Sequence, residues 1–216
     1  RRPATPTRPA ASAVERAADI LAAAKRPLVL CQRSGTDAAV WEMLVKLADN
    51  FALPVGEHWT IRPGFPTGHP MHAGFAPSAA IAEADALLVI DSMVPWIPAH
   101  TDLADDCQVI QLGADPLVSK VPVRGYPSDL SLAGDVGLTL TDLHAALADR
   151  LAPNQANVVA RREKLATDHT KARQAVMAIA EAGGGSPMHP FYATLCINRA
   201  FGPDATYVSE LALNPG

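Results

Sequence analysis

The sequence predicts an α/β protein, a doubly wound and mostly parallel sheet of about six strands with helices on both faces (Rossmann-like), followed by a C-terminal fragment of a second α/β domain. Two observations support this fold class. Short, continuously apolar runs such as residues 86–91 (ALLVID) are typical of strands that are buried on both faces of a parallel sheet. Amphipathic helical patterns alternate with these runs, and such alternation favours right-handed crossover connections.

Five strands are expected at residues 28–31, 54–57, 86–91, 107–112 and 130–133, and helices at residues 12–25, 36–51, 78–84 and 138–151. Continuously apolar strands need cover on both faces, and the apolar stripe of a helix faces the sheet. We therefore expect the following residues to be buried: Val29, Leu30, Leu44, Leu47, Leu87, Leu88, Val89, Ile90, Val109 and Ile110.

The sequence pattern of residues 152–216 predicts that a second domain begins in this part of the chain. A long charged helix at residues 155–182 ends at three consecutive glycines, and a helix at 190–201 and a strand at 206–209 follow. We divide the chain into a linker (1–11), a central domain (12–151), a helical connector (152–186) and the start of another domain (187–216). One helix and one strand bury too little surface to offset their ordering entropy. We therefore expect helix 190–201 to dock through Phe191, Leu195 and Phe201 on the central domain or on a second copy.

Composition excludes several classes of protein. The net charge is -4 and the basic residues are scattered, which argues against nucleic acid as a partner. No apolar run approaches the roughly 20 residues of a membrane helix. Three distant cysteines without a CxxC motif indicate neither a disulfide framework nor a zinc site, and reduced thiols indicate a cytoplasmic protein. The N-terminal residues lack the apolar segment of a signal peptide and read as the interior of a longer chain.

Two polar segments invite a ligand interpretation, each with a structural alternative. The turn after the first strand, CQRSGTDAA, could offer the backbone N–H groups of Ser34, Gly35 and Thr36 to a phosphate, or it is a plain turn, because the GxGxxG glycines are absent. His58, His69 and His72 lie in a loop rich in Gly and Pro. They are loop residues rather than metal ligands, since HxxH without a cysteine or carboxylate at ligand spacing is a weak signal.

The strongest strand ends at Asp91 and Ser92, where α/β sheets bind ligands. The Pro-stiffened segment 94–98 that follows is interpreted as a rigid loop at a domain or subunit contact. Neither a nucleophile elbow nor a carboxylate pair is recognisable in the sequence. An α/β domain without chemistry of its own suggests one module of a larger enzyme.

Six segments carry a resemblance: AADILAAAKRPLVL, LVKLADNFALPV, GHPMHAGF, IAEADALLVIDSMVPWIP, CQVIQLGADPL and DLSLAGDVGLTL. Their order and spacing over roughly residues 12–151 resemble the central domain of thiamine diphosphate-dependent enzymes of the acetolactate synthase and benzoylformate decarboxylase superfamily. The FAD-binding members carry a glycine-rich turn after the first strand and a glycine-led segment after the strand at 86–91. This chain has neither, so FAD is not expected.

The resemblance implies a fragment of an enzyme that acts on 2-oxo acids by carboligation or decarboxylation, as a homodimer or homotetramer. Thiamine diphosphate and Mg²⁺ would bind the full-length protein, and none is expected to bind this fragment. Residues 186–210 resemble the entry to the cofactor-binding domain, and by position Ser209, Glu210 and Leu211 map to a loop that touches the diphosphate. No catalytic residue and no metal ligand is assigned. The alternatives are a free-standing nucleotide-binding domain and a structural or oligomerisation module without catalysis.

Overall fold

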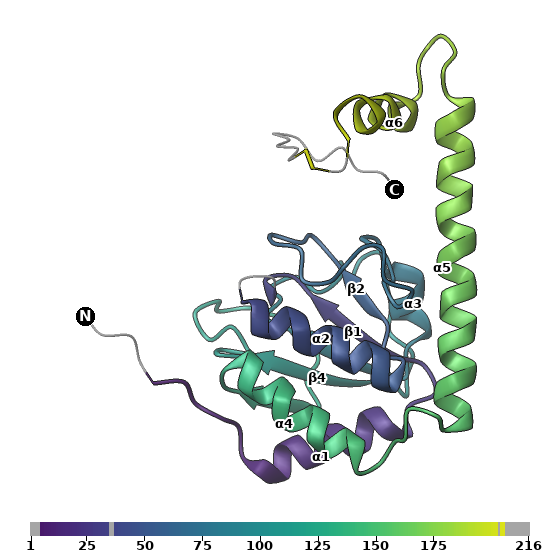
Figure 1. Ribbon diagram of the computed structural model, residues 1–216. Helices are drawn as coiled ribbons and strands as arrows, with labels where there is room; N and C mark the ends of the chain where they lie inside the picture. The colour runs from purple at the N-terminus through teal and green to yellow at the C-terminus, as the bar shows by residue number, and fades with distance from the viewer. Residues whose placement is uncertain (1–4, 35–36, 203, 206–216) are drawn as a thin grey trace. The chain divides into compact units, whose positions relative to one another are not determined.

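A computed structural model describes residues 5–34, 37–202 and 204–205. The chain divides into two compact units, residues 1–165 and residues 166–216, and each is described by itself. The first unit holds the sheet (Figure 1).

The sheet consists of five parallel strands, which confirms the predicted α/β class. The strands are β1 (Pro27–Cys31), β2 (Val55–Glu57), β3 (Ala86–Ile90), β4 (Gln108–Gly113) and β5 (Leu130–Ala133), in the order β2-β1-β3-β4-β5. All five predicted segments are strands, and their bounds shift by one residue or less at each end.

The expected sixth strand is absent from the part of the chain that the structure describes. The outer edge of β2 is instead paired with residues 71–74, where Val55 forms a single parallel bridge with His72. The amide of Val55 donates to the carbonyl of Met71 at 2.9 Å, and the amide of Ala73 donates to the carbonyl of Val55 at 2.8 Å. These bonds protect an edge that would otherwise expose unpaired backbone groups.

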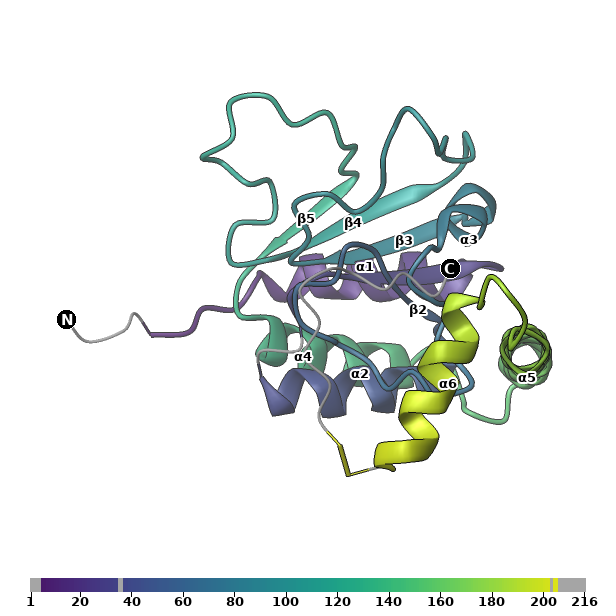
Figure 2. The same cartoon turned by 90° about the horizontal axis from the view of Figure 1, so that it is seen from above.

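Helices cover both faces of the sheet, as predicted (Figure 2). On one face lie α1 (Ala11–Ala23), α2 (Ala38–Phe51) and α4 (Val136–Ala148), with α4 packed against both of the others. The other face carries the short helix α3 (Ser78–Glu83). The carboxylates of Asp37 and Asp135 cap α2 and α4 by accepting from backbone amides of the first turn, which satisfies donors that a helix start leaves unpaired.

Alternate residues of each strand point to opposite faces and build two cores. Val29, Leu88 and Ile110 belong to the larger core beneath α1, α2 and α4. Leu87 and Val109 belong to the smaller core beneath α3. All ten residues that the sequence predicted to be buried are buried.

The segment after β3 packs on its own domain. Trp96 is 3 % exposed and lies in the smaller core, where its ring meets the Tyr126 ring edge-on at 5.0 Å. The hydroxyl of Tyr126 donates to the carbonyl of Trp96 at 2.8 Å. The prediction that segment 94–98 lies at a domain or subunit contact is therefore wrong for Trp96, because this face of the sheet has only one short helix to cover it.

The long helix α5 (Ala156–Ala182) begins in the first unit and continues into the second, which also holds α6 (Pro190–Phe201). The imidazole of His189 caps α6 by accepting from the amide of Phe191 at 3.1 Å. None of the residues of α6, all of which are described, is buried, and Phe201 is 70 % exposed. The docking expected through Phe191, Leu195 and Phe201 stays a prediction. The expected strand at 206–209 lies outside the described residues.

Replacement of Leu88 by Ala should lower the free energy of unfolding by about 2–5 kcal/mol, because it removes a fully buried side chain from the larger core. Urea denaturation measures the change. The control is Val123→Ala at a side chain that is 85 % exposed, where we expect a change within about 0.5 kcal/mol. Equal effects of the two substitutions would contradict the burial of β3.

Candidate functional site

The carboxyl ends of the strands meet at one edge of the sheet, and a crevice opens there beside the junction of β1 and β3, lined by residues that follow β1 and β3 and by the end of β4 and its loop. The strand order reverses at this point, because β1 lies between β2 and β3. The chain leaves β1 toward α2 on one face, whereas Trp96 after β3 packs on the other face. Ligands of open α/β sheets bind where connections separate in this way.

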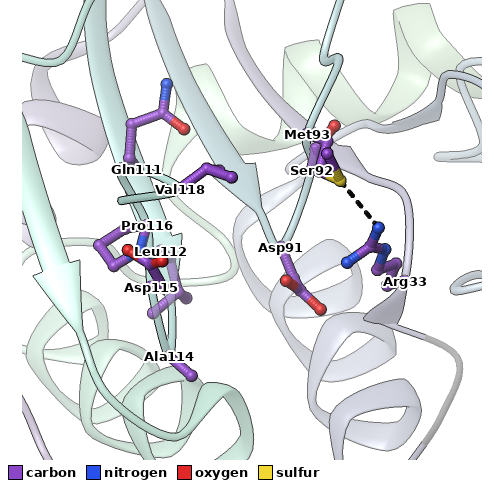
Figure 3. A pocket seen from close by; sticks show the side chains of 10 residues that line it. All are labelled: Arg33, Asp91, Ser92, Met93, Gln111, Leu112, Ala114, Asp115, Pro116 and Val118. Carbon is purple, nitrogen blue, oxygen red and sulfur yellow. Dashed lines mark hydrogen bonds between the residues drawn. The ribbon is translucent and has the colours of Figure 1, made fainter. Parts of the chain in front are cut away.

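A cavity of about 200 Å³ lies at this edge (Figure 3). It is formed by residues that directly follow β1 and β3, by the end of β4 and by the loop after β4. The lining residues are Arg33, Asp91, Ser92, Met93, Gln111, Leu112, Ala114, Asp115, Pro116 and Val118. The volume suits a small polar group or one part of a larger ligand rather than a whole cofactor.

Backbone strain marks the end of β3. Asp91 has φ 41°, a left-handed conformation that a non-glycine residue rarely adopts. Its amide is held by the carbonyl of Leu112 at 2.8 Å, and its side chain is exposed and lines the cavity. Strained residues tend to cluster at functional sites, and the structure places both Asp91 and Ser92 in the lining of the cavity; a ligand at this position stays a prediction.

The cavity contains a cation, two carboxylates and an unpaired hydroxyl. Nη2 of Arg33 lies 3.0 Å from the Met93 sulfur, and Figure 3 marks this contact by a dashed line. The amide and hydroxyl of Ser119 both donate to Asp115 at 2.8 Å and hold the pKa of its carboxyl below the usual range. The buried Ser92 hydroxyl has no hydrogen-bond partner among the described residues. These groups can bind a polar ligand, but they offer no pair of a nucleophile and a base.

One arginine organises the backbone beside the cavity. Nη2 of Arg124 donates to the carbonyl of Ser92 at 2.9 Å and lies 3.5 Å from the side-chain oxygen of Gln111. Its guanidinium lies over the Tyr126 ring at 5.0 Å. Burial lowers the pKa of Arg124. Arg124 therefore links the loop after β4 to the residues after β3, and both of these segments line the cavity.

A buried carboxylate anchors the loop after β2. Glu57 is fully buried and accepts from the amide of Gly64 at 2.7 Å, and its second oxygen lies 3.1 Å from Nε2 of His72. His69 is 3.1 Å from the Asp49 carboxylate. His69 and His72 are thus each paired with a carboxylate, whereas the buried Nε2 of His58 has no hydrogen-bond partner among the described residues and burial lowers the pKa of His58. No group of three or more metal-ligating side chains occurs in the described ranges.

The other predicted site residues are located as follows. Ser34 is described, and its buried hydroxyl has no partner within the described residues. Gly35 and Thr36 lie outside the described residues, and so do Ser209, Glu210 and Leu211. The sequence analysis missed Arg33 and Asp115. Both directly follow strands of the predicted sheet, so the rule that ligands bind at the carboxyl edge could have found them.

Comparison with known proteins identifies the family. The family model of the thiamine pyrophosphate enzyme central domain matches residues 14–143, more than half of the chain. The chain therefore belongs to this family. The matched segment includes all five strands and the cavity.

Particular relatives agree with the family. The chain is 26% identical over 143 residues to oxalyl-CoA decarboxylase of Escherichia coli (strain K12), covering 64% of this chain and 24% of the relative. It thus spans about a quarter of the length of this relative. A solved structure from Mycobacterium smegmatis, assigned to the thiamin diphosphate-dependent enzymes, is 27% identical, with a TM-score of 0.57 over 71% of this chain and 31% of that one.

Benzoylformate decarboxylase from Polynucleobacter necessarius has the same fold, with a TM-score of 0.57 at 22% identity over 68% of this chain and 29% of that one. A search of the described helices found none that is long and apolar enough to cross a membrane.

Replacement of Glu57 by Ala should destabilise the first unit by about 2–4 kcal/mol, because it leaves two buried donors unpaired. Glu57→Gln keeps the shape and one acceptor and should cost less. Urea denaturation measures both, and hydrogen exchange should lose protection at residues 64–74. The control is Glu83→Ala, at an exposed glutamate. Unchanged protection in Glu57→Ala would show that the carboxylate does not hold this loop.

Proposed function

We propose that the chain is the central-domain region of a longer thiamine diphosphate-dependent enzyme that acts on a 2-oxo acid or a 2-oxoacyl derivative by decarboxylation or carboligation. The observation that carries the proposal is the family match over residues 14–143. The name of the Escherichia coli relative supports decarboxylation. When bound to the enzyme, thiamine diphosphate supplies the electron sink that carbanion chemistry requires.

The described residues would have a structural role in this enzyme and would not take part in the chemical step. The cavity holds Arg33, Asp91 and Asp115, and its Ser92 hydroxyl has no hydrogen-bond partner among the described residues. We assign thiamine diphosphate and Mg²⁺ to other parts of the enzyme, with Ser209, Glu210 and Leu211 as candidate contacts to the diphosphate. We assign residues 1–11 to a linker, 12–151 to the central domain, 152–186 to a connector and 187–216 to the start of the cofactor-binding domain. We also propose that the longer enzyme is cytoplasmic, that it forms a homodimer or homotetramer, and that it does not use FAD.

A second candidate function is nucleotide binding by the central domain itself. The specific observation in its favour is the cavity at the switch point between β1 and β3, with the Arg33 guanidinium and the unpaired Ser92 hydroxyl. A phosphate group would pair with the guanidinium and accept from the hydroxyl. The absence of GxGxxG from the turn after β1 weighs against a dinucleotide.

The first test compares cofactor binding by the 216-residue chain with cofactor binding by the full-length protein. Calorimetric titration of the 216-residue chain with thiamine diphosphate and Mg²⁺ should give no binding heat, because we assign the main binding groups for both to parts of the enzyme outside these 216 residues. The full-length protein should bind both and release carbon dioxide from at least one of oxalyl-CoA, benzoylformate and pyruvate. A full-length protein that binds no thiamine diphosphate would overturn the proposal and favour a structural or oligomerisation module.

The second test addresses the cavity. The chain is titrated with ADP, NAD, FAD and coenzyme A, and each ligand that binds is titrated again into Arg33→Ala. Loss of the guanidinium should weaken binding about tenfold or more, since a charge-assisted hydrogen bond contributes roughly 1.5–3 kcal/mol. Arg16→Ala, at an exposed arginine of α1, is the control. Absence of binding by all four ligands would reject this second function.

A further inference from the structure

Part of the loop after β2 lies directly on the turn that follows β1. This part, residues 58–64, is called the cover. The amide of Ile61 donates to the carbonyl of Gln32 at 3.0 Å, and the amide of Gly64 donates to the Glu57 carboxylate at 2.7 Å. The cover and the turn both belong to the first unit, so their contact is a feature of that unit alone.

Gly64 allows the cover to approach the turn closely. A Cβ atom at this position would lie 2.3 Å from the hydroxyl oxygen of Ser34 and 3.1 Å from the sulfur of Cys31. Both distances are shorter than an ordinary van der Waals contact. The φ angle of Gly64 is not in the left-handed region. The glycine is therefore needed for space and not for its backbone conformation.

The closed cover leaves polar groups unpaired and one residue strained. Nε2 of His58 and Oγ1 of Thr60 are buried and have no hydrogen-bond partner among the described residues. Trp59, which lies between them in the chain, has φ 48°, a left-handed conformation that is rare for a bulky side chain. If the cover lifted, water would bond to both polar groups and the strain would relax. The closed position is therefore held against an opposing cost.

The large apolar side chains of the cover contribute little to holding it closed. Trp59 is 64 % exposed and Ile61 is 61 % exposed, so lifting them would expose little further apolar area. The two ends of the cover are firmly held, because Glu57 before it and Phe65 after it are fully buried. The segment is thus fixed at both ends and weakly held between them.

The turn beneath the cover also supports the cavity at the carboxyl edge. The carbonyl of Gln32 accepts from Ile61, and the side-chain oxygen of Gln32 accepts from the amide of Met93 at 3.0 Å. Met93 and Arg33, the residue after Gln32, both line the cavity (Figure 3). Movement of the cover therefore releases a hydrogen bond at a residue that holds one side of the cavity.

We propose that the cover is a lid, which opens over the turn after β1 while the sheet stays folded. Opening breaks the hydrogen bond between Ile61 and Gln32 and uncovers Cys31. It also frees the backbone next to Arg33, so the state of the cover controls access to this part of the carboxyl edge. The inference does not rest on either proposed function, because it concerns only contacts among described residues of the first unit.

The test measures how fast the Cys31 thiol reacts with a chromogenic disulfide reagent. Cys107 and Cys196 are replaced by Ser, which leaves Cys31 as the one thiol of the chain. Cys31 is 2 % exposed, and burial raises the pKa of its thiol to about 12, so the covered thiol reacts very slowly. Below the unfolding transition the reaction rate should not depend on urea, because a local opening exposes little surface.

Gly64→Ala should raise the reaction rate about tenfold or more, because the closed cover has no space for the added methyl group. Ser34→Ala removes the oxygen nearest to this methyl group, so Gly64→Ala/Ser34→Ala should react more slowly than Gly64→Ala alone. Gly68→Ala is the matched control in the same loop, where a Cβ atom would meet nothing within 4 Å. It should react like the parent chain. Urea denaturation establishes that each variant is folded.

Two outcomes would overturn the proposal. If the reaction of Cys31 in the parent chain depends on urea as steeply as global unfolding does, the cover opens only when the sheet unfolds. If folded Gly64→Ala reacts no faster than Gly68→Ala, contact with the turn does not hold the cover. Should Gly64→Ala fail to fold, hydrogen exchange of the parent chain decides. The Ile61 amide should exchange faster than the Val29 amide of β1, and equal exchange would contradict local opening.

Discussion

The requirement to cover both faces of the three inner strands governs the arrangement of the first unit. β1, β3 and β4 lie between neighbours, and their apolar side chains alternate between two cores. Three helices cover one face, but the other has only α3, so Trp96 and Tyr126 from irregular segments complete its core. The chain therefore continues after β1 to a helix on one face and after β3 to Trp96 on the other face. Because these two connections separate, they leave a crevice at the carboxyl edge of the sheet.

The cavity in that crevice combines features of a binding site without those of a catalytic centre. Arg33 and the carboxylates of Asp91 and Asp115 offer charge, and the unpaired Ser92 hydroxyl offers a hydrogen bond. Arg124 holds the surrounding backbone in place. A polar cavity on the sheet of a chain that belongs to the thiamine pyrophosphate enzyme central domain family supports our proposal of a module within a longer enzyme.

The first turns of α5 are held on the first unit by a different kind of contact. The helix ends that pack on the sheet leave carbonyls without partners, and Arg161 and Arg162 satisfy them from α5. Backbone groups that are unpaired at a helix end are costly when shielded from water. The two arginines therefore stabilise α2 while they anchor α5, so that one set of hydrogen bonds serves the domain and its connection.

The sequence by itself determined the fold class, the five strands, the ten buried residues and, through six motifs in register, the family. Burial on both faces imposes a local apolar pattern, and a local pattern is readable along the chain. Only the tertiary structure decided that residues 71–74 replace a sixth strand, that Trp96 faces its own core, and that Arg161 reaches the end of α2. Each of these depends on contacts between segments distant in the chain, made by hydrogen bonds or by apolar packing, and the local pattern of residues does not record which distant segment is the partner.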